Sequence, residues 1–410
     1  MKAVEIRDSL YSWLRLAVSM VIGLVASASM WAVVVIMPSV ELELSLTRAE
    51  TSMPFTLLML GYGLGSFVIG RLTDRVGITR VLIGATLGIV ASFSGAIAAA
   101  DIVQLSVAHL ALGLGAAAGF APLMSDISHW FLKWRGTAIA AVASANYLSG
   151  AFWPTAMANV LAESGWRQAY VTLAVITFST MIPLALLLRR RVKDPARDLA
   201  QDVKSSPVHR PRISPRTLQL SLGLAGIACC IAMSMPQVHL VTYCVGLGYG
   251  PVAGAEMLSL MLFGGVLSRM IFGVMADRLG GVRTLLLGSV LQTIGLALYL
   301  PYDGLVSLYV ISLVFGLAQG GIVPSYALLV REYLPAKAAG AGVGFVLMMT
   351  IWGMALGGWM SGWIYDATGS YEMAFFNGIV WNLCNIGIVL ALFFRNPPGM
   401  RLLLSGKASV

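Results

Sequence analysis

Charged residues are scarce in this sequence. Lysine, arginine, aspartate and glutamate together make up 11% of the 410 residues, whereas an ordinary soluble domain has roughly 25%. This shortage excludes a water-soluble body of this size, because too few charges are available to coat its surface. Hydrophobic residues make up 58% of the chain, and a bilayer-spanning helix needs only about 20 of them. The composition therefore predicts a membrane protein with many helices.

Cysteines and enzyme motifs are also scarce. The four cysteines lie in apolar stretches without metal-ligand spacing, which predicts small buried hydrophobic residues: Cys229, Cys230, Cys244 and Cys384. No nucleophile–base pair, phosphate loop or ATP-binding motif appears, so we expect no enzyme activity, no cofactor and no metal. Many apolar runs follow the first one, so that run is not a cleaved signal peptide. The length of the runs and their lack of period-2 alternation argue against a β-barrel.

The apolar runs predict an all-α membrane protein with twelve transmembrane helices. The first set is expected at 14–38, 52–72, 79–99, 102–125, 136–161 and 166–189. The second is expected at 217–246, 251–275, 282–301, 304–330, 338–366 and 372–395. The segment 189–216 between them is basic, contains prolines and has few apolar residues, which is typical of a linker. We therefore expect an N-terminal six-helix bundle (1–188), a linker (189–216) and a C-terminal six-helix bundle (217–410).

The distribution of lysine and arginine predicts the orientation of these helices. With both termini in the cytoplasm, the outer loops contain only Arg48 and Arg167, while the inner side holds nearly all other cations. The formal net charge of +9 then reflects topology, and we expect no nucleic-acid partner. We expect a multi-pass protein of the plasma membrane, a bacterial inner membrane, surrounded by lipid and monomeric.

The two halves of the sequence repeat. Residues 70–77 read GRLTDRVG and residues 273–280 read GVMADRLG, so both fit G-x-x-x-D-R-x-G at an offset of 203 (273 − 70). At or near the same offset, Gly113 pairs with Gly316 and Pro122 with Pro324. One copy of such a turn could arise by chance, but two copies in matching loops indicate two parallel six-helix repeats.

With these repeats the sequence resembles the major facilitator superfamily over nearly its whole length. Residues 130–140 (WFLKWRGTAIA) are similar to the aromatic-Phe-x-Lys-x-Arg-x-x-Ala signature of monocarboxylate transporters and the related oxalate/formate antiporters. The acidic-Gly-aromatic signature that these transporters have at the start of helix 1 is missing, since residues 15–20 read RLAVSM. The resemblance implies a conformational gate of salt bridges at the inner turns, made by Asp74, Arg75, Asp277 and Arg278.

Arg269 is the candidate for binding substrate. It is expected to be the one formal charge inside the membrane, with no aspartate or glutamate in any predicted span. A buried arginine costs roughly 2.5–3.5 kcal/mol on insertion scales, so it needs a partner, a cavity or a route to water. One interpretation is that the missing anion is a substrate carboxylate, bound by the guanidinium fork. The other is that the side chain reaches the interface or bonds to helix-end carbonyls.

The resemblance supports the first interpretation, because these transporters have a substrate-binding arginine at the matching place in helix 8. Two differences from these transporters narrow the expected substrate. Gly265 stands where proton-coupled relatives often have an aspartate, and residues 348–352 lack the second cation of the oxalate antiporter. One fixed cation suits a monoanion better than a dianion.

Other polar or aromatic residues in the predicted spans could complete a substrate site. His239 follows Pro236 in helix 7 and could carry a coupling proton or bond the substrate, or could only join helices. The same alternatives apply to the remaining candidates: Asn146, Tyr147, Phe120, Trp352, Tyr326, Gln319, Trp31 and Tyr62.

The sequence therefore predicts a secondary active transporter that moves a small organic anion, most simply a monocarboxylate, by alternating access. A coupled proton or counter-anion would supply the driving force. Efflux of a drug or metabolite is the alternative transport function. A transporter-like membrane sensor is a remote one, because such sensors usually carry an extra signalling domain or a docking tail.

Overall fold

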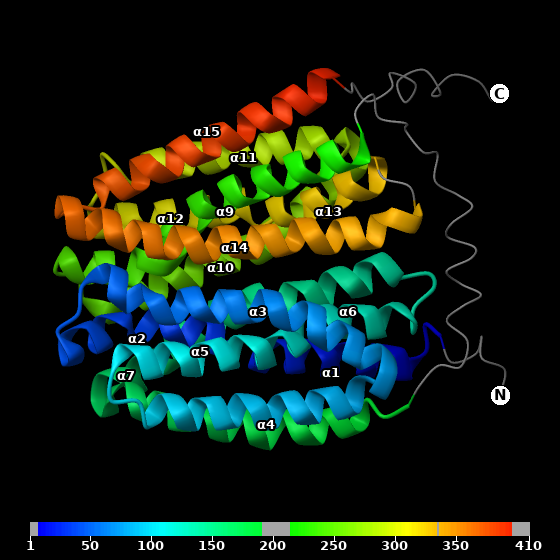
Figure 1. The fold of residues 1–410 in the computed structure, drawn as a ribbon, viewed down its shortest axis with the longest axis horizontal. Helices are drawn as coiled ribbons and strands as arrows, with labels where there is room; N and C mark the ends of the chain where they lie inside the picture. Colours follow the sequence, from blue (N-terminus) through cyan, green and yellow to red (C-terminus); the bar gives the residue numbers. More distant parts are fainter. Residues whose placement is uncertain (1–6, 191–213, 334–335, 396–410) are drawn as a thin grey trace.

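The computed structural model describes residues 7–190, 214–333 and 336–395, and within these ranges every regular element is a helix (Figure 1). The helices of the N-terminal half are α1 (Leu10–Ala26), α2 (Ala28–Leu44), α3 (Arg48–Val76), α4 (Ile78–Ile97), α5 (Ile102–Ala116), η1 (Ala117–Gly119), α6 (Ala121–Ser128) and α7 (Arg135–Leu187). Those of the C-terminal half are α9 (Pro215–Gly246), α10 (Gly250–Leu279), α11 (Gly281–Leu298), α12 (Leu305–Gln319), α13 (Ile322–Tyr333), α14 (Ala336–Thr368) and α15 (Glu372–Arg395).

These helices make twelve crossings. The described residues contain 11 apolar segments long enough to span a membrane. One of them, α7, turns back at Gly165, where φ is 79° and ψ is 170°, so it supplies two crossings. Three crossings are broken into shorter helices: α1 with α2, α5 with α6, and α12 with α13. The predicted twelve-helix fold in two bundles is confirmed, and most helix boundaries agree with the prediction within a few residues.

Three helices begin at residues whose side chains cap the first turn. Thr47 and Glu50 form a capping box at the start of α3, and the side chains of Asp101 and Ser214 accept from backbone N–H groups at the starts of α5 and α9. A helix satisfies its own backbone groups, which hydrocarbon cannot do, so uninterrupted apolar runs fold as helices.

The repeated glycines take equivalent conformations in the two halves. Gly77 after α3 has φ 88° and ψ 157°, and Gly280 after α10 has φ 80° and ψ 163°. Both donate their backbone N–H four residues back, to Thr73 and to Ala276. We call the end of the molecule that carries Gly77 and Gly280 the motif end. The opposite end carries the turns at Gly165 and Gly369.

A second pair of glycines shows that the two bundles are packed alike. A Cβ atom on Gly113 would lie 2.0 Å from the carbonyl oxygen of Leu58, and one on Gly316 would lie 1.9 Å from that of Met261. The contacted residues are again 203 positions apart (261 − 58). Small residues at these points let α5 pack against α3 and α12 against α10 with their backbones in contact.

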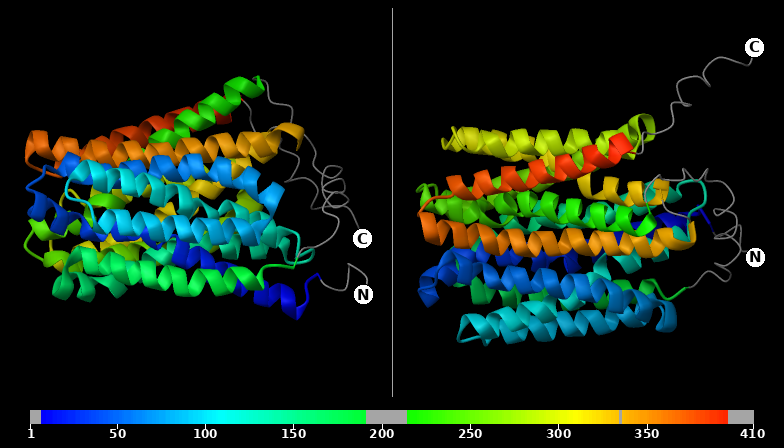
Figure 2. Two further views of the ribbon diagram at one scale, coloured as in Figure 1. Left: turned by 60° about the horizontal axis from the view of Figure 1, so that its bottom comes forward. Right: turned by 45° about the horizontal axis from the view of Figure 1, so that its top comes forward.

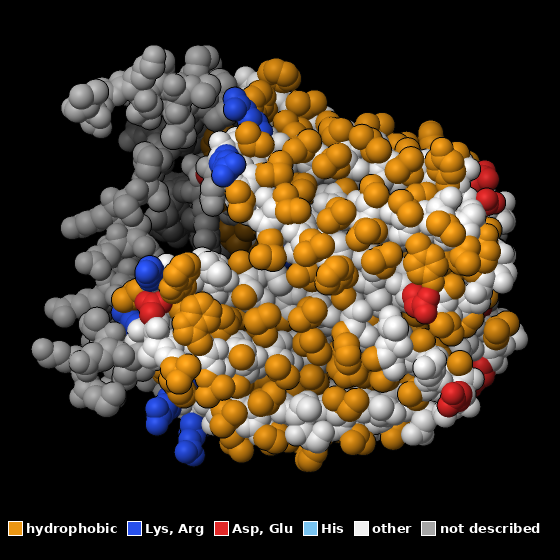
Figure 3. Space-filling model, turned by 180° about the vertical axis from the view of Figure 1, so that it is seen from behind, with side chains coloured by type: hydrophobic (Ala, Val, Ile, Leu, Met, Phe, Trp, Pro, Cys, Tyr) orange, Lys and Arg blue, Asp and Glu red, His pale blue; other side chains and the backbone are white. Residues whose placement is uncertain are grey.

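The two halves lie side by side with their helices roughly parallel (Figures 1 and 2). Between them, α3 packs along α14 and α7 along α10. The space-filling view shows a broad apolar band, with lysine and arginine at the motif end and most acidic residues at the opposite end (Figure 3). It also shows a recess between the halves at the motif end (Figure 3). This surface is that of a protein embedded in a bilayer.

Candidate functional site

Arg269 lies on α10, half-buried and ten residues (279 − 269) before the end of that helix, which is about 15 Å at 1.5 Å per residue. Its Nε donates to the carbonyl oxygen of Gly320 at 3.2 Å, and its Nη1 donates to the carbonyl oxygen of Ala143 on α7. The guanidinium carbon stands 3.9 Å from the ring centroid of Tyr147, also on α7. Arg269 therefore belongs to the C-terminal half but touches both halves.

The helix break between α12 and α13 supplies one of these partners. Because α12 ends at Gln319 and α13 begins at Ile322, the Gly320 carbonyl is free to accept a bond from a side chain. Two glycines bring it close, since a Cβ atom on Gly320 would lie 2.1 Å from the carbonyl oxygen of Gly265. The negative end of the α12 dipole also favours a cation at this place.

Gly265 shapes the other side of the guanidinium. A Cβ atom at this position would lie 2.3 Å from Cδ1 of Tyr147, so a larger residue would displace the ring. An aspartate at position 265 would place a carboxylate next to Arg269. Gly265 instead leaves room for the ring of Tyr147 to lie against the guanidinium. Tyr62 on α3 is a further phenol close enough to interact with Arg269.

Arg269 differs in its partners from three other arginines of this chain, each of which pairs with an acid. Arg15 pairs with Asp126 at 2.7 Å, Arg48 with Glu41 at 2.5 Å, and Arg167 with Glu43 at 2.5 Å. Within the described part of the chain, no carboxylate forms an ion pair with Arg269. Its partners are neutral carbonyl groups and an aromatic face.

The Arg15–Asp126 pair corrects the expectation that Arg269 is the one charge among the spans. Arg15 is 2% exposed, and its Nε and Nη2 donate to the two carboxylate oxygens of Asp126 at 2.7 and 2.8 Å. The prediction was wrong because Arg15 lies within the first span, and because α6 continues to Ser128, beyond the predicted end at residue 125, so that Asp126 belongs to a span as well. A bidentate pair satisfies both charges locally, whereas the half-buried Arg269 has no carboxylate partner among the described residues.

Gln319 lies next to the Arg269 contact and pairs with a residue that the sequence analysis did not single out. Its Oε1 accepts from Nε2 of Gln237 on α9 at 2.9 Å, and both side chains are buried. The hydroxyl of Tyr147 interacts with Gln237 as well. A glutamine directly after Pro236 within an apolar helix was the available signal for Gln237.

Trp352 and Phe120 lie at the interface between α3 and its neighbours. The Nε1 atom of Trp352 is buried without a partner, and it would lie 3.2 Å from a Cβ atom on Gly63. Phe120, in the break between η1 and α6, packs on a small cluster that includes Tyr62. Tyr147 contacts Arg269 and Gln319 precedes its Gly320 partner, while Trp352 and Phe120 lie beside Gly63 and Tyr62 on α3.

Three of the predicted residues form contacts inside their own halves. Trp31 Nε1 donates to the backbone oxygen of Asn146 at 3.0 Å, and Nδ2 of Asn146 donates to Ser27 Oγ at 3.3 Å. The Tyr326 hydroxyl donates to Oδ1 of Asn385 on α15 at 2.5 Å. These bonds favour helix-to-helix roles for Trp31, Asn146 and Tyr326.

His239 is buried with both ring nitrogens in use. Nε2 lies 2.7 Å from the carbonyl oxygen of Gly358 and Nδ1 lies 3.2 Å from the hydroxyl of Tyr371. Burial raises the pKa of Tyr371, so the phenol stays protonated and donates to Nδ1 while Nε2–H donates to the carbonyl. This neutral tautomer joins α9 to α14, and it favours the structural interpretation.

The predicted gate is described only in part. Arg75 and Arg278 are exposed in the last turns of α3 and α10. The side chains of Asp74 and Asp277 lie outside the described residues, so the salt bridges of this gate stay a prediction. Cys384 is exposed on α15, which corrects the expectation that all four cysteines are buried.

A closure that the sequence did not indicate lies at the opposite end. Asp366, near the end of α14, accepts from the backbone N–H groups of Arg48 and Ala49, at 2.8 Å each. These N–H groups belong to the first turn of α3, so the two bonds join the halves. Nearer the middle, Thr56 Oγ1 donates to the carbonyl oxygen of Ala355 at 3.2 Å.

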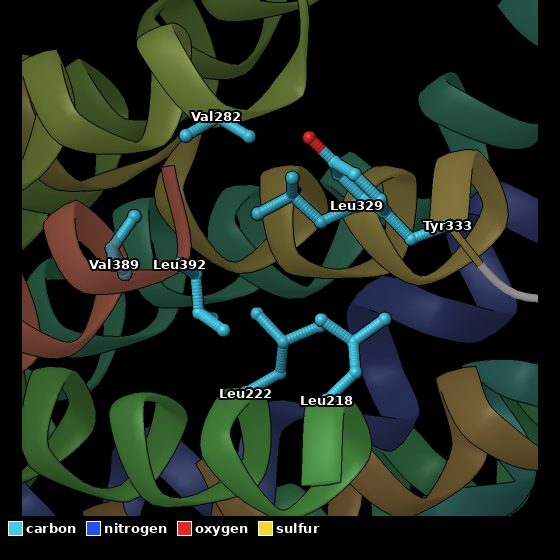
Figure 4. A pocket seen from close by; sticks show the side chains of 7 residues that line it. All are labelled: Leu218, Leu222, Val282, Leu329, Tyr333, Val389 and Leu392. Atoms are coloured by element: carbon cyan, nitrogen blue, oxygen red, sulfur yellow. The ribbon is translucent and has the colours of Figure 1, made fainter. Parts of the chain in front are cut away.

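An apolar cavity lies within the C-terminal half, away from the polar groups around Arg269 (Figure 4). Its volume of about 10 Å³ is close to the space of one water molecule. It is lined by Leu218, Leu222, Val282, Leu329, Tyr333, Val389 and Leu392. Its size and apolar walls make it a packing defect of the bundle.

The comparisons with known proteins agree with this architecture. The family model of the Major Facilitator Superfamily matches residues 19–268 and 252–408. The chain is 26% identical over 341 residues to Monocarboxylate transporter 13 of Rattus norvegicus, covering 80% of this chain and 76% of that protein. It is 25% identical over 331 residues to the Agnestins efflux protein AgnL12 of Paecilomyces divaricatus, covering 80% and 74%.

Among solved structures, the fold is similar to that of the nucleoside transporter NupG, with a TM-score of 0.69 and 14% sequence identity over 93% of this chain and 99% of that one. The repeated bundles, the apolar belt and the family match lead to one assignment. This chain belongs to the major facilitator superfamily and is a multi-pass membrane transporter.

Proposed function

We propose that this transporter carries a small organic monoanion, a monocarboxylate, and that Arg269 binds the carboxylate. The observation that carries the proposal is the set of partners of Arg269: two carbonyl oxygens and a ring, whereas the fully buried Arg15 pairs with an acid. An unneutralised guanidinium between the two halves is a site for an anion from solution. The Monocarboxylate transporter relatives support the same class of substrate.

Two buried donor groups left without partners support an anion too. Gln319 Nε2 and Trp352 Nε1 are both unpartnered, and both are hydrogen-bond donors only. Donors without acceptors fit a ligand that brings acceptor oxygens, as a carboxylate does.

We further propose that the motif end faces the cytoplasm, because the basic residues gather there (Figure 3). With the Asp366 bonds intact at the opposite end and a recess at the motif end, substrate would enter from the cytoplasmic side in this conformation. Transport then requires the halves to rock about the α3–α14 and α7–α10 contacts around a fixed site. A coupled proton or a counter-anion completes the cycle.

The test is uptake of radiolabelled acetate, propionate and butyrate into proteoliposomes. Replacing Arg269 by Gln keeps donors for the carbonyl partners but removes the charge. A charge-assisted hydrogen bond contributes about 1.5–3 kcal/mol, so uptake at low substrate concentration should fall at least ~10-fold. Arg269→Lys should be intermediate, because an ammonium lacks the guanidinium fork.

The matched control is Arg216→Gln, which removes one exposed arginine from the first turn of α9. It should keep wild-type uptake. If Arg269→Gln matches this control while both proteins unfold at the wild-type temperature, the carboxylate site is refuted.

Efflux of a larger metabolite is the second candidate, and it is supported by relatives such as the efflux protein from Paecilomyces divaricatus. Export of an uncharged hydrophobic dye that is insensitive to Arg269→Gln, without carboxylate uptake, would favour it over the first.

A further inference from the structure

Gln237 and Gln319 form an amide pair inside the C-terminal half, next to the proposed carboxylate site. Gln237 is 1% exposed and Gln319 is 0% exposed. One bond joins them, from Gln237 Nε2 to Gln319 Oε1 at 2.9 Å. Two long amides held together in the apolar middle of a bundle lose conformational entropy and hydration, and a single neutral bond offsets little of that cost.

The pair has a spare donor group. Nε2 of Gln319 is buried and has no hydrogen-bond partner, although an amide nitrogen carries two donor hydrogens. Buried polar groups are nearly always paired in folded proteins, so an exception calls for an explanation. A methionine or leucine would fill the same volume without leaving a polar atom unsatisfied.

The pair lies deeper than Arg269 along the path from the motif end. Gln319 immediately precedes Gly320, whose carbonyl accepts from Arg269. Since α12 runs from the opposite end toward the motif end, Gln319 lies on the opposite-end side of that contact. Tyr147 connects the two groups, because its ring covers the guanidinium and its hydroxyl interacts with Gln237.

We propose that the Gln237–Gln319 pair is a second recognition point, at which the free Nε2 of Gln319 donates a hydrogen bond to an acceptor oxygen on the substrate beyond its carboxylate. Gln237 is a positioning residue that holds the amide of Gln319 through Oε1. The transporter therefore discriminates between carboxylates of equal length by the presence of that second oxygen. This inference rests on the proposed carboxylate site at Arg269.

The experiment measures initial uptake rates of butyrate, 2-oxobutyrate and 3-oxobutyrate in proteoliposomes. The three acids have the same chain length and differ only in the presence and place of one carbonyl oxygen. The wild type should prefer at least one oxo acid over butyrate by about tenfold or more in kcat/KM, because a site built to bond an oxygen rejects the analogue that lacks it. Gln319→Met should lower this preference to near unity.

Two further variants separate recognition from folding. Gln237→Met should also reduce the preference, because it frees Gln319 from its anchor. Gln292→Met removes a buried glutamine of α11 that bonds to Cys229, and it should leave the preference at the wild-type value. Thermal unfolding in detergent shows whether each variant is folded.

The outcomes distinguish the two proposals. Equal wild-type uptake of all three acids, abolished by Arg269→Gln, overturns the second recognition point and keeps the carboxylate site. An oxo-acid preference that survives Gln319→Met does the same. Absence of Arg269-dependent uptake for every acid overturns the carboxylate site and this inference with it.

Discussion

Asp366 joins the two halves at the opposite end of the molecule, and Asp366→Asn tests how much of the closure this carboxylate holds. Asp366 accepts from the N–H groups of Arg48 and Ala49 at 2.8 Å each, and so caps α3 of one half from α14 of the other. Asparagine has nearly the same shape. It keeps one acceptor oxygen, loses the second, and removes the charge from the positive end of α3.

The size of the effect can be worked from these contacts. Two bonds to a carboxylate contribute about 1.5–3 kcal/mol each, and one neutral bond that replaces them contributes about 0.5–1.5 kcal/mol. A charge at a helix N-terminus adds about 0.3–1 kcal/mol. Because these groups are exposed, the low end of each range applies, and the net loss is about 2–3 kcal/mol. At about 1.4 kcal/mol per factor of ten, the equilibrium moves ~30–140-fold toward opening at this end.

Double electron–electron resonance between spin labels on the two halves measures this shift. Glu163 and Tyr302 are exposed near the opposite end, one in each half. Labels are attached at Glu163→Cys and Tyr302→Cys after the native cysteines are replaced. Asp366→Asn should add a population at longer distance.

The control for this measurement is Glu372→Gln, which neutralises an exposed acid in the first turn of α15. Its side chain makes no bond to the N-terminal half within the described residues, so its distances should match the wild type. If Asp366→Asn gives the same distribution as Glu372→Gln, the two backbone bonds do not hold the halves together and the reasoning fails.

Three further predictions concern stability and proton dependence. Gly316→Ala places a Cβ 1.9 Å from the carbonyl oxygen of Met261, so overpacking should cost about 1–3 kcal/mol and lower the thermal unfolding temperature; an unchanged temperature would contradict backbone contact between α10 and α12. Arg15→Met alone leaves the half-buried Asp126 without its partner and should cost about 3 kcal/mol, the low end for a buried pair. The double variant with Asp126→Leu should recover much of that loss, and equal stability of single and double variants would speak against a tight pair. His239→Gln should leave the pH profile of uptake unchanged, because both ring nitrogens already serve neutral hydrogen bonds; a shifted profile would show that the ring titrates during transport.

The fold was predictable from the sequence because each membrane crossing corresponds to one apolar run and the two halves share a motif. Arg269 could be proposed as a substrate-binding candidate on similar grounds, because it is a charged residue within an apolar run. The contacts of the other candidate binding residues could not be predicted from the sequence. Trp31 and Tyr326 lie on suitable helices, but their rotation about the helix axis, set by packing, turns them toward neighbours in their own half.

Some functional contacts left no local signal in the sequence. Asp366 and Arg48 are 318 residues apart, and nothing near either residue indicates that the two helices meet end to end. Gln237 lies in an apolar run, and an amide at such a position is as compatible with a contact between helices as with a binding site. Asp126 was predicted to lie outside a helix because polar residues follow Met124, although α6 continues to Ser128.

The bond from Arg269 to the Ala143 carbonyl has a consequence for the order of events in transport. Arg269 and Ala143 belong to different halves, so any motion that parts the halves at this depth must first release the guanidinium from the carbonyl. A bound carboxylate competes for the same donors and can replace that bond. The substrate-free protein keeps this bond between its halves, and we therefore expect it to change conformation more slowly than the loaded one. Exchange should then be faster than efflux into buffer without substrate, and equal rates for the two would contradict this.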